Sequence, residues 1–86
     1  MSQGIGVTVR LFAWLRDAAQ CAECRLQLAS GASGVDAKTA LLARWPGLVG
    51  TIEAARLAVN CEYQPWDVRL FHDDELAVIP PVSGGC

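Results

Sequence analysis

The stretch Glu75-Leu76-Ala77-Val78-Ile79 decides the fold, because it is apolar at nearly every position. A strand with one buried face alternates apolar and polar residues, whereas a strand buried on both faces is apolar throughout. We therefore expect residues 75–79 to form a central strand of a sheet. Pro80 and Pro81 follow directly, and since proline cannot donate a ladder hydrogen bond, the strand ends there.

A second apolar segment lies near the other end of the chain. Residues 5–12 alternate with a period of two, which predicts a strand that buries Ile5, Val7, Val9 and Leu11 and places Phe12 on the opposite face. Shorter strands are predicted at residues 25–28 and 56–59, with a turn at Asn60-Cys61, a return strand from Glu62-Tyr63, and a short edge strand at residues 68–70.

One main helix is predicted between these strands. Ser33 is its expected N-cap, and Asp36 three residues later resembles a capping box. Pro46-Gly47 ends the helix. We expect its buried stripe to carry Val35, Thr39, Leu42 and the pair Leu41/Trp45. The Ala-rich residues 13–20 predict a short helical turn, and residues 48–55 a connection with room for another short turn.

These elements define a fold class. The first and last strands are the most apolar, so we expect them to pair at the centre of a sheet, with the helix across a single face. This is an α+β protein with a β-grasp arrangement, in which a mixed sheet of four to five strands carries one main helix. We expect residues 1–79 to form the domain and residues 80–86 to form a flexible C-terminal tail.

Composition excludes several classes of protein. The chain has 86 residues and a mass of 9.2 kDa, enough for one domain. Seven basic against nine acidic residues give a net charge of −2, which argues against a nucleic-acid partner. No apolar run reaches about 20 residues, so no membrane partner is predicted. Residues 1–9 lack the pattern of a secretory signal, so the cytoplasm is the expected compartment.

The four cysteines are Cys21, Cys24, Cys61 and Cys86. In a reducing cytoplasm they are expected to be thiols. Cys21 and Cys24 have the spacing of zinc and redox sites, but Cys61 and His72 form no second pair of ligands, so no metal site is predicted. Because the motif leads into a strand rather than a helix, we interpret its thiols as incidental. His72 lies among acidic turn residues and is expected to be solvated.

The C-terminal string is the most specific part of the sequence. After Ile79 it reads Pro80-Pro81-Val82-Ser83-Gly84-Gly85-Cys86. The prolines favour a stiff stem that projects from the body, and the glycines have no side chain and fit a narrow slot. A rigid stem with a slim tip is what a carrier needs when a partner's active site must reach its C-terminus.

Nearly the whole chain resembles the ubiquitin-like sulfur carriers, and most closely the small subunit of molybdopterin synthase. The resemblance rests on Leu11-Phe12-Ala13-Trp14-Leu15-Arg16-Asp17, Pro46-Gly47-Leu48, Ala58-Val59-Asn60, Glu62-Tyr63, Asp74-Glu75-Leu76-Ala77 and the string from Ile79 to Gly85. The thiamin-pathway carriers are less similar, because they usually lack the Leu-Phe-Ala-x-Leu-Arg stretch.

The resemblance implies a chemical cycle on Gly85. A ubiquitin-activating-type adenylyltransferase uses ATP to adenylate the glycine carboxylate, and persulfide sulfur converts it to a thiocarboxylate. The large subunit of molybdopterin synthase then receives the tail, with Gly84 giving it entry. The chain binds no cofactor and is not a catalyst on its own. The family's partner-facing positions correspond here to Phe12, Ile79, Pro80, Pro81, Val82 and Ser83, and for Phe12 core packing is an equal alternative.

Cys86 departs from the family pattern, because it ties the Gly85 carboxyl into a peptide bond. Four interpretations remain open: a one-residue propeptide, a mimic of a carrier–cysteine adduct, an artificial addition, and a functional thiol or metal ligand. We favour the propeptide, which implies a JAMM-type zinc metallopeptidase that cuts between Gly85 and Cys86. Three alternative functions also remain: a carrier for cysteine or other metabolite synthesis, a protein modifier joined to lysines, and an interaction module with an inert tail.

Overall fold

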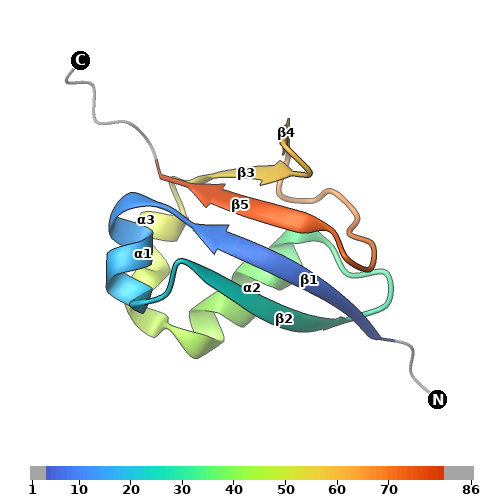
Figure 1. Cartoon of the computed structure of the whole chain (residues 1–86), viewed down its shortest axis with the longest axis horizontal. Helices are drawn as coiled ribbons and strands as arrows, with labels where there is room; N and C mark the ends of the chain where they lie inside the picture. The colour runs from blue at the N-terminus through green and yellow to red at the C-terminus, as the bar shows by residue number, and fades with distance from the viewer. Residues whose placement is uncertain (1–3, 81–86) are drawn as a thin grey trace.

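The computed structural model describes residues 4–80, which form a five-stranded sheet with helices packed on it. In chain order the elements are β1 (Gly4–Leu11), α1 (Ala13–Ala19), β2 (Glu23–Ala29), α2 (Gly34–Arg44), the 3₁₀ turn η1 (Pro46–Leu48), α3 (Val49–Ile52), β3 (Arg56–Val59), β4 (Glu62–Gln64) and β5 (Glu75–Ile79). Figure 1 shows their arrangement. None of the helices in this part of the chain has the length and apolarity needed to span a bilayer.

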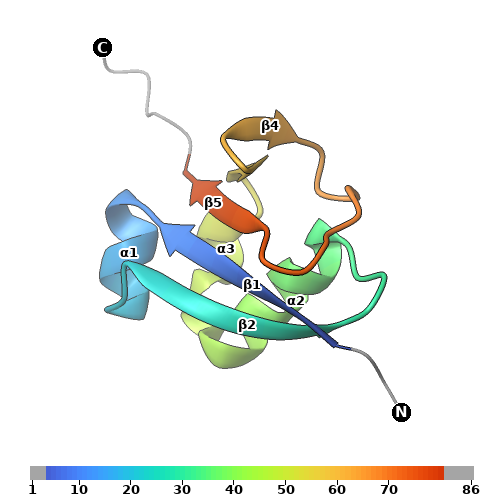
Figure 2. The ribbon, with the colours of Figure 1, turned by 45° about the vertical axis from the view of Figure 1, so that its right-hand side comes forward.

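The sheet has the strand order β2-β1-β5-β3-β4, so the first and last strands pair at its centre, as predicted. β1 and β5 run parallel, with Val9 opposite Leu76 and Leu11 opposite Val78. The other pairs are antiparallel. Figure 2 shows the β3–β4 hairpin at one edge and β2 at the other. This mixed sheet with helices on one face confirms the predicted β-grasp fold.

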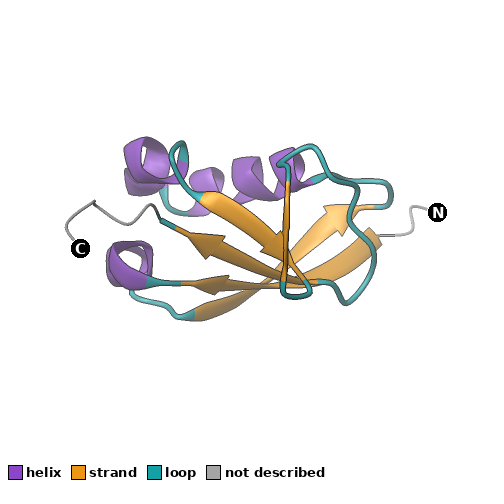
Figure 3. Cartoon of the chain, turned by 90° about the horizontal axis from the view of Figure 1, so that it is seen from above, coloured by secondary structure: helices purple, strands orange, loops and turns teal. Residues whose placement is uncertain are grey.

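The core lies between the sheet and the helices that cover one of its faces (Figure 3). The odd-numbered residues of β1 point into it, as the alternation predicted, and Leu76 and Val78 of β5 join them. The predicted helix stripe is confirmed in part: Leu41 is buried, and Leu42 and Trp45 are partly buried against the core. It was wrong at Val35, which is 46% exposed, and at Thr39, which is exposed as well. The buried face of α2 carries Gly34, Ala37 and Leu41. Small side chains let the helix approach the sheet closely, and such positions give no apolar signal in the sequence.

Residues 68–70 do not form the predicted edge strand. They make an isolated bridge to the loop before α2, in which the Gly34 N–H donates to the Val68 carbonyl at 2.9 Å and the Leu70 N–H to the Ala32 carbonyl at 2.8 Å. The segment therefore fixes the start of α2. The predicted cap is confirmed there, since Ser33 is the N-cap and its N–H donates to Asp36 Oδ2 at 2.8 Å.

Replacing Gly34 by alanine is expected to destabilise the protein by about 2–3 kcal/mol, because a Cβ there would collide with the Trp66 carbonyl oxygen and the Leu57 side chain. Gly50, in α3, faces open space and is the matched control. Gly50→Ala is expected to stabilise by about 0.5 kcal/mol through helix propensity. Urea unfolding of both variants measures the difference, and equal midpoints would contradict the close packing at Gly34.

The predicted turn at Asn60-Cys61 is present and is a tight hairpin turn. Both residues have positive φ, 51° and 72°, as a two-residue type I′ turn requires. The Asn60 side chain fixes the turn to the start of β5: its Nδ2 donates to Asp74 Oδ1 at 2.9 Å, and its Oδ1 accepts the Glu75 N–H at 3.0 Å. The second turn position is the one where glycine is favoured, and Cys61 occupies it.

Cys61→Gly is therefore expected to raise the free energy of unfolding by about 0.5–1 kcal/mol, since a Cβ disfavours left-handed backbone. Cys61→Ala removes the thiol and keeps the Cβ, so it is expected to leave stability unchanged. Thermal unfolding of the two variants separates the backbone effect from the loss of sulfur. A gain of the same size in both would show that the thiol, and not the backbone, limits stability here.

Candidate functional site

The root of the C-terminal tail lies at the end of the sheet where β1 also ends. β5 runs parallel to β1 (Figure 1). Val78 is opposite Leu11, so Ile79 follows at the level of Phe12. Phe12 is not in the core: it is the N-cap residue of α1 and is 43% exposed. An exposed aromatic side chain therefore lies at the same end of the sheet as the start of the tail.

The remaining predicted site residues divide into two groups. Ile79 is half-buried on the sheet, and Pro80 is buried, so Pro80 packs into the body of the domain rather than projecting from it as we expected. The others, in the tail, lie outside the described residues: Pro81, Val82, Ser83, Gly84, Gly85 and Cys86.

A second surface adjoins the tail root, on the side of the sheet that no helix covers within residues 4–80 (Figure 3). Alternation along β1, β3, β4 and β5 places Thr8 and Glu75 on this side, together with six further side chains that we call the outer face: Arg10, Arg56, Ala58, Tyr63, Ala77 and Ile79. Arg10, Ala77, Ala58 and Tyr63 follow one another in register across the four strands. The centre of this face is thus small and apolar, with Arg10 on one side and Tyr63 on the other. Arg56 lies two residues from Ala58 along β3, opposite Ile79.

The two arginines of the outer face differ in their partners. Arg10 is neutralised by carboxylates, with its Nε 2.8 Å from Glu75 Oε2 and a longer 3.8 Å contact to Glu23. Arg56 instead lies over the Tyr63 ring, 5.8 Å from its centroid. Among residues 4–80, no carboxylate lies within ion-pair distance of Arg56. The outer face therefore carries one cation without a carboxylate partner, beside β4.

A further ion pair lies at the end of the sheet opposite the root of the C-terminal tail. Arg25 donates to Asp73 Oδ1 at 2.8 Å and to Thr8 Oγ1 at 3.1 Å. The hydrogen bond from Arg25, together with the nearby His72, holds the pKa of the Asp73 carboxyl below its usual value. His72 itself accepts the Gly6 N–H on Nδ1 at 2.9 Å. This imidazole therefore ties a turn to β1, while most of its surface stays in solvent as predicted.

The CxxC motif forms part of the fold. Cys24 points into the core from β2, and burial raises the pKa of its thiol. The Cys21 thiol is half-buried and donates to the Glu23 carbonyl at 2.8 Å. Within the described part of the chain, no three His, Cys, Asp or Glu side chains gather as metal ligands would. A buried thiol with a raised pKa is a poor nucleophile, which supports the interpretation of incidental thiols.

Comparison with known protein families shows to which of them the chain belongs. Residues 9–85 match the model of the ThiS family. The chain belongs to the ThiS family. The match includes Gly84 and Gly85 and leaves Cys86 outside it.

Similar proteins support this membership of the ThiS family. The molybdopterin synthase sulfur carrier subunit of Arabidopsis thaliana is 32% identical over 84 residues, which cover 98% of this chain and 88% of that protein. The protein of the same name from Chlamydomonas reinhardtii is 36% identical over 81 residues, covering 92% and 98%. The crystal structure of small archaeal modifier protein 1 from Haloferax volcanii superposes with a TM-score of 0.85, at 28% identity over 93% of this chain and 99% of that one.

The chain is thus a ubiquitin-like protein of the sulfur carrier type, as its sequence predicted. The sequence predicted the tail, Phe12 and Ile79 as candidates, and apart from Ile79 the residues of the outer face were missed. Arg56, Tyr63 and Ala77 carry no motif of their own. Counting alternate residues along each strand would have found them only once the strand order was known, because the face is assembled from four strands.

Proposed function

We propose that the chain carries sulfur as a thiocarboxylate on Gly85 and delivers it in molybdopterin biosynthesis. The observation that carries the proposal is the ThiS family match, which runs through the Gly-Gly string and ends at Gly85. The curated relatives similar over nearly the whole chain are molybdopterin synthase sulfur carrier subunits. The position of the tail root, beside an exposed aromatic side chain and an uncovered sheet face, fits such a role.

The proposed activation begins on the free carboxylate of Gly85. A carboxylate is a poor electrophile, so a ubiquitin-activating-type adenylyltransferase joins it to AMP from ATP and releases pyrophosphate. The terminal sulfur of a persulfide displaces AMP, and a thiol cleaves the resulting disulfide to leave the thiocarboxylate. The chain itself supplies the acyl group and the docking surface, while the catalytic groups belong to its partners.

Cys86 requires a preceding step in this proposal. A JAMM-type zinc metallopeptidase hydrolyses the Gly85–Cys86 peptide bond by means of a metal-activated water, which frees the Gly85 carboxylate and releases cysteine. The family match supports this order, because it stops at the residue before Cys86. Processing would keep the carrier inactive until the peptidase has acted.

The outer face and Phe12 form the proposed docking surface for the large subunit of molybdopterin synthase. Apolar side chains at the centre and charged side chains at the rim are typical of protein interfaces. Here Ala58 and Ala77 lie at the centre, with Arg10 beside Ala77 on β1 and Arg56 two residues from Ala58 along β3. A partner that covers this face also lies next to the tail root, so docking and tail insertion occur together.

A protein modifier is the second candidate, and the similarity to small archaeal modifier protein 1 favours it. In that role the same acyl-adenylate is transferred to lysine amines of target proteins. Immunoblots of cell extract against this chain distinguish the two functions. The carrier role predicts a single band of free chain, whereas a ladder of larger bands that survives reducing agent would establish the modifier role.

A further inference from the structure

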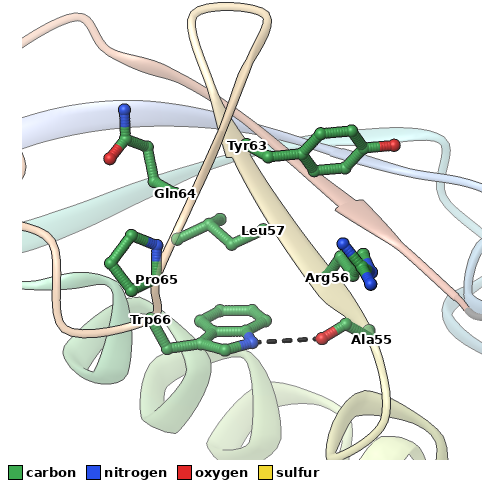
Figure 4. Close-up of a pocket in the computed structure, with 7 residues that line it drawn as sticks. All are labelled: Ala55, Arg56, Leu57, Tyr63, Gln64, Pro65 and Trp66. Atoms are coloured by element: carbon green, nitrogen blue, oxygen red, sulfur yellow. Dashed lines mark hydrogen bonds between the residues drawn. The ribbon is translucent and has the colours of Figure 1, made fainter.

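A pocket of about 380 Å³ opens beside the β3–β4 hairpin. Figure 4 shows Tyr63 and Arg56 on one side of it, Pro65 and Trp66 on the other, and Leu57 between them. This volume lies at the lower end of the range for ligand sites, so it suits one side chain or a small fragment rather than a large cofactor. Apart from Arg56, no lining residue carries a formal charge.

The wall formed by Trp66 is held in place before any ligand arrives. Its Nε1–H donates to the Ala55 carbonyl oxygen at 3.1 Å. The Lys38 ammonium lies 4.7 Å from the centroid of the Trp66 ring and 3.7 Å from a Glu53 carboxylate oxygen. A pre-organised aromatic wall loses little conformational entropy on binding. The Lys38 charge is neutralised, whereas Arg56 has no carboxylate partner within residues 4–80.

The pocket is continuous with the outer face, because Arg56 and Tyr63 belong to both. A partner that covers the outer face therefore reaches the pocket without a further movement of the chain. Aromatic walls favour an aromatic side chain, and a guanidinium pairs best with a planar carboxylate. The aromatic walls of the pocket and the charge of Arg56 therefore favour an aromatic side chain with a carboxylate next to it.

We propose that this pocket receives an aromatic side chain from a partner protein, with an adjacent acidic residue that pairs with Arg56. The inference rests on the proposed function in one respect: it takes the outer face to be a docking surface. It adds a specificity site at the hairpin, away from the tail that carries the chemistry. The pocket would then select partners by an aromatic–acidic pair, whatever acceptor receives the sulfur.

The test uses the full chain and two capped dipeptides, acetyl-Phe-Glu-amide and acetyl-Phe-Gln-amide, which differ in charge alone. The indole N–H resonance of Trp66 is the reporter, because Trp66 lines the pocket and this N–H is bonded to Ala55, another lining residue. We expect saturable shifts with a dissociation constant in the range of about 1 mM. We expect the Glu peptide to bind about tenfold more tightly than the Gln peptide, since a charge-assisted hydrogen bond distinguishes them.

Two arginine variants make the test specific. Arg56→Gln is expected to remove the difference between the two peptides. Arg69→Gln is the matched control, since Arg69 also lies over an aromatic ring, that of Phe71, at 5.4 Å, but does not line the pocket. Arg69→Gln is expected to retain the tenfold preference. Thermal unfolding checks that both variants fold.

The absence of a saturable shift at Trp66, or equal affinities for the two peptides, would overturn the inference. So would a loss of the preference in Arg69→Gln alone. None of these outcomes bears on the proposed sulfur transfer, because the peptides are tested without the adenylyltransferase, the peptidase or the large subunit. Failure of the pocket and failure of the carrier function are therefore distinguished.

Discussion

A chain that ends at Gly85 is expected to be adenylated, whereas the full 86-residue chain is expected to be inert toward the same enzyme. In the full chain the Gly85 carbonyl belongs to the amide that joins it to Cys86, and the terminal carboxylate lies one residue further on, on Cys86. Displacement of a reacting group by about 1 Å already costs about 100-fold in rate, and one residue is a larger displacement. We therefore expect the rates of ATP–pyrophosphate exchange to differ by at least about 100-fold.

Two variants of the shortened chain serve as controls. A chain that ends at Gly84 is expected to lose activity as the full chain does, because its carboxylate falls one residue short. In the shortened chain, Gly85→Ala is expected to abolish thiocarboxylate formation. In the full chain, the same substitution is expected to slow the removal of Cys86. In both cases the added side chain hinders entry of the tail into a partner's narrow active-site slot. Equal exchange rates for the 85- and 86-residue chains would show that Cys86 does not block activation.

A charge placed at the centre of the outer face is expected to weaken binding of the large subunit by at least about 100-fold. Ala77→Glu places a carboxylate on β5, in register with Arg10 and Ala58. Arg10 is already paired with Glu75, so the new carboxylate has no free cation opposite it. An unpaired charge buried at an interface costs about 3–5 kcal/mol, which is more than two factors of ten in affinity. Calorimetric titration of the large subunit with the variant measures the loss.

Ala43→Glu is the control for this prediction, because Ala43 is exposed on α2, which packs against the opposite face of the sheet. It introduces the same charge and is expected to bind as the unmodified chain does. Unchanged unfolding temperatures would show that both variants keep the fold. If the two substitutions weakened binding equally, the loss would reflect net charge, and the outer face would not be the docking surface.

The sheet was predictable because its signals are local. The alternation of residues 5–11 and the continuous apolar run of residues 75–79 report their burial directly, and the observed pairing of β1 with β5 follows from those two signals. The hairpin at Asn60 was predictable as well, although Cys61 occupies the position where glycine is usual. Each of these signals is carried by neighbouring residues within one strand or one turn.

The errors arise where packing between distant segments decides the structure. Gly34 and Ala37 are buried because α2 lies close against the sheet and Trp66, and no apolar pattern marks such small residues. Residues 68–70 resemble a strand but bridge to the start of α2 instead. The pocket joins β3 to Pro65 and Trp66, so it exists only in the folded chain. The outer face cannot be recognised in the sequence either, because its side chains come from four strands that meet only in the folded chain.

The intact mass of the protein isolated from its own cells shows whether Gly85 becomes the working end of the chain. We expect a population that has lost the cysteinyl residue, part of it with one oxygen replaced by sulfur. That result would establish Gly85 as the working end and Cys86 as a processed residue. If every molecule retained Cys86, the account would be contradicted, because no free Gly85 carboxylate would exist to carry sulfur.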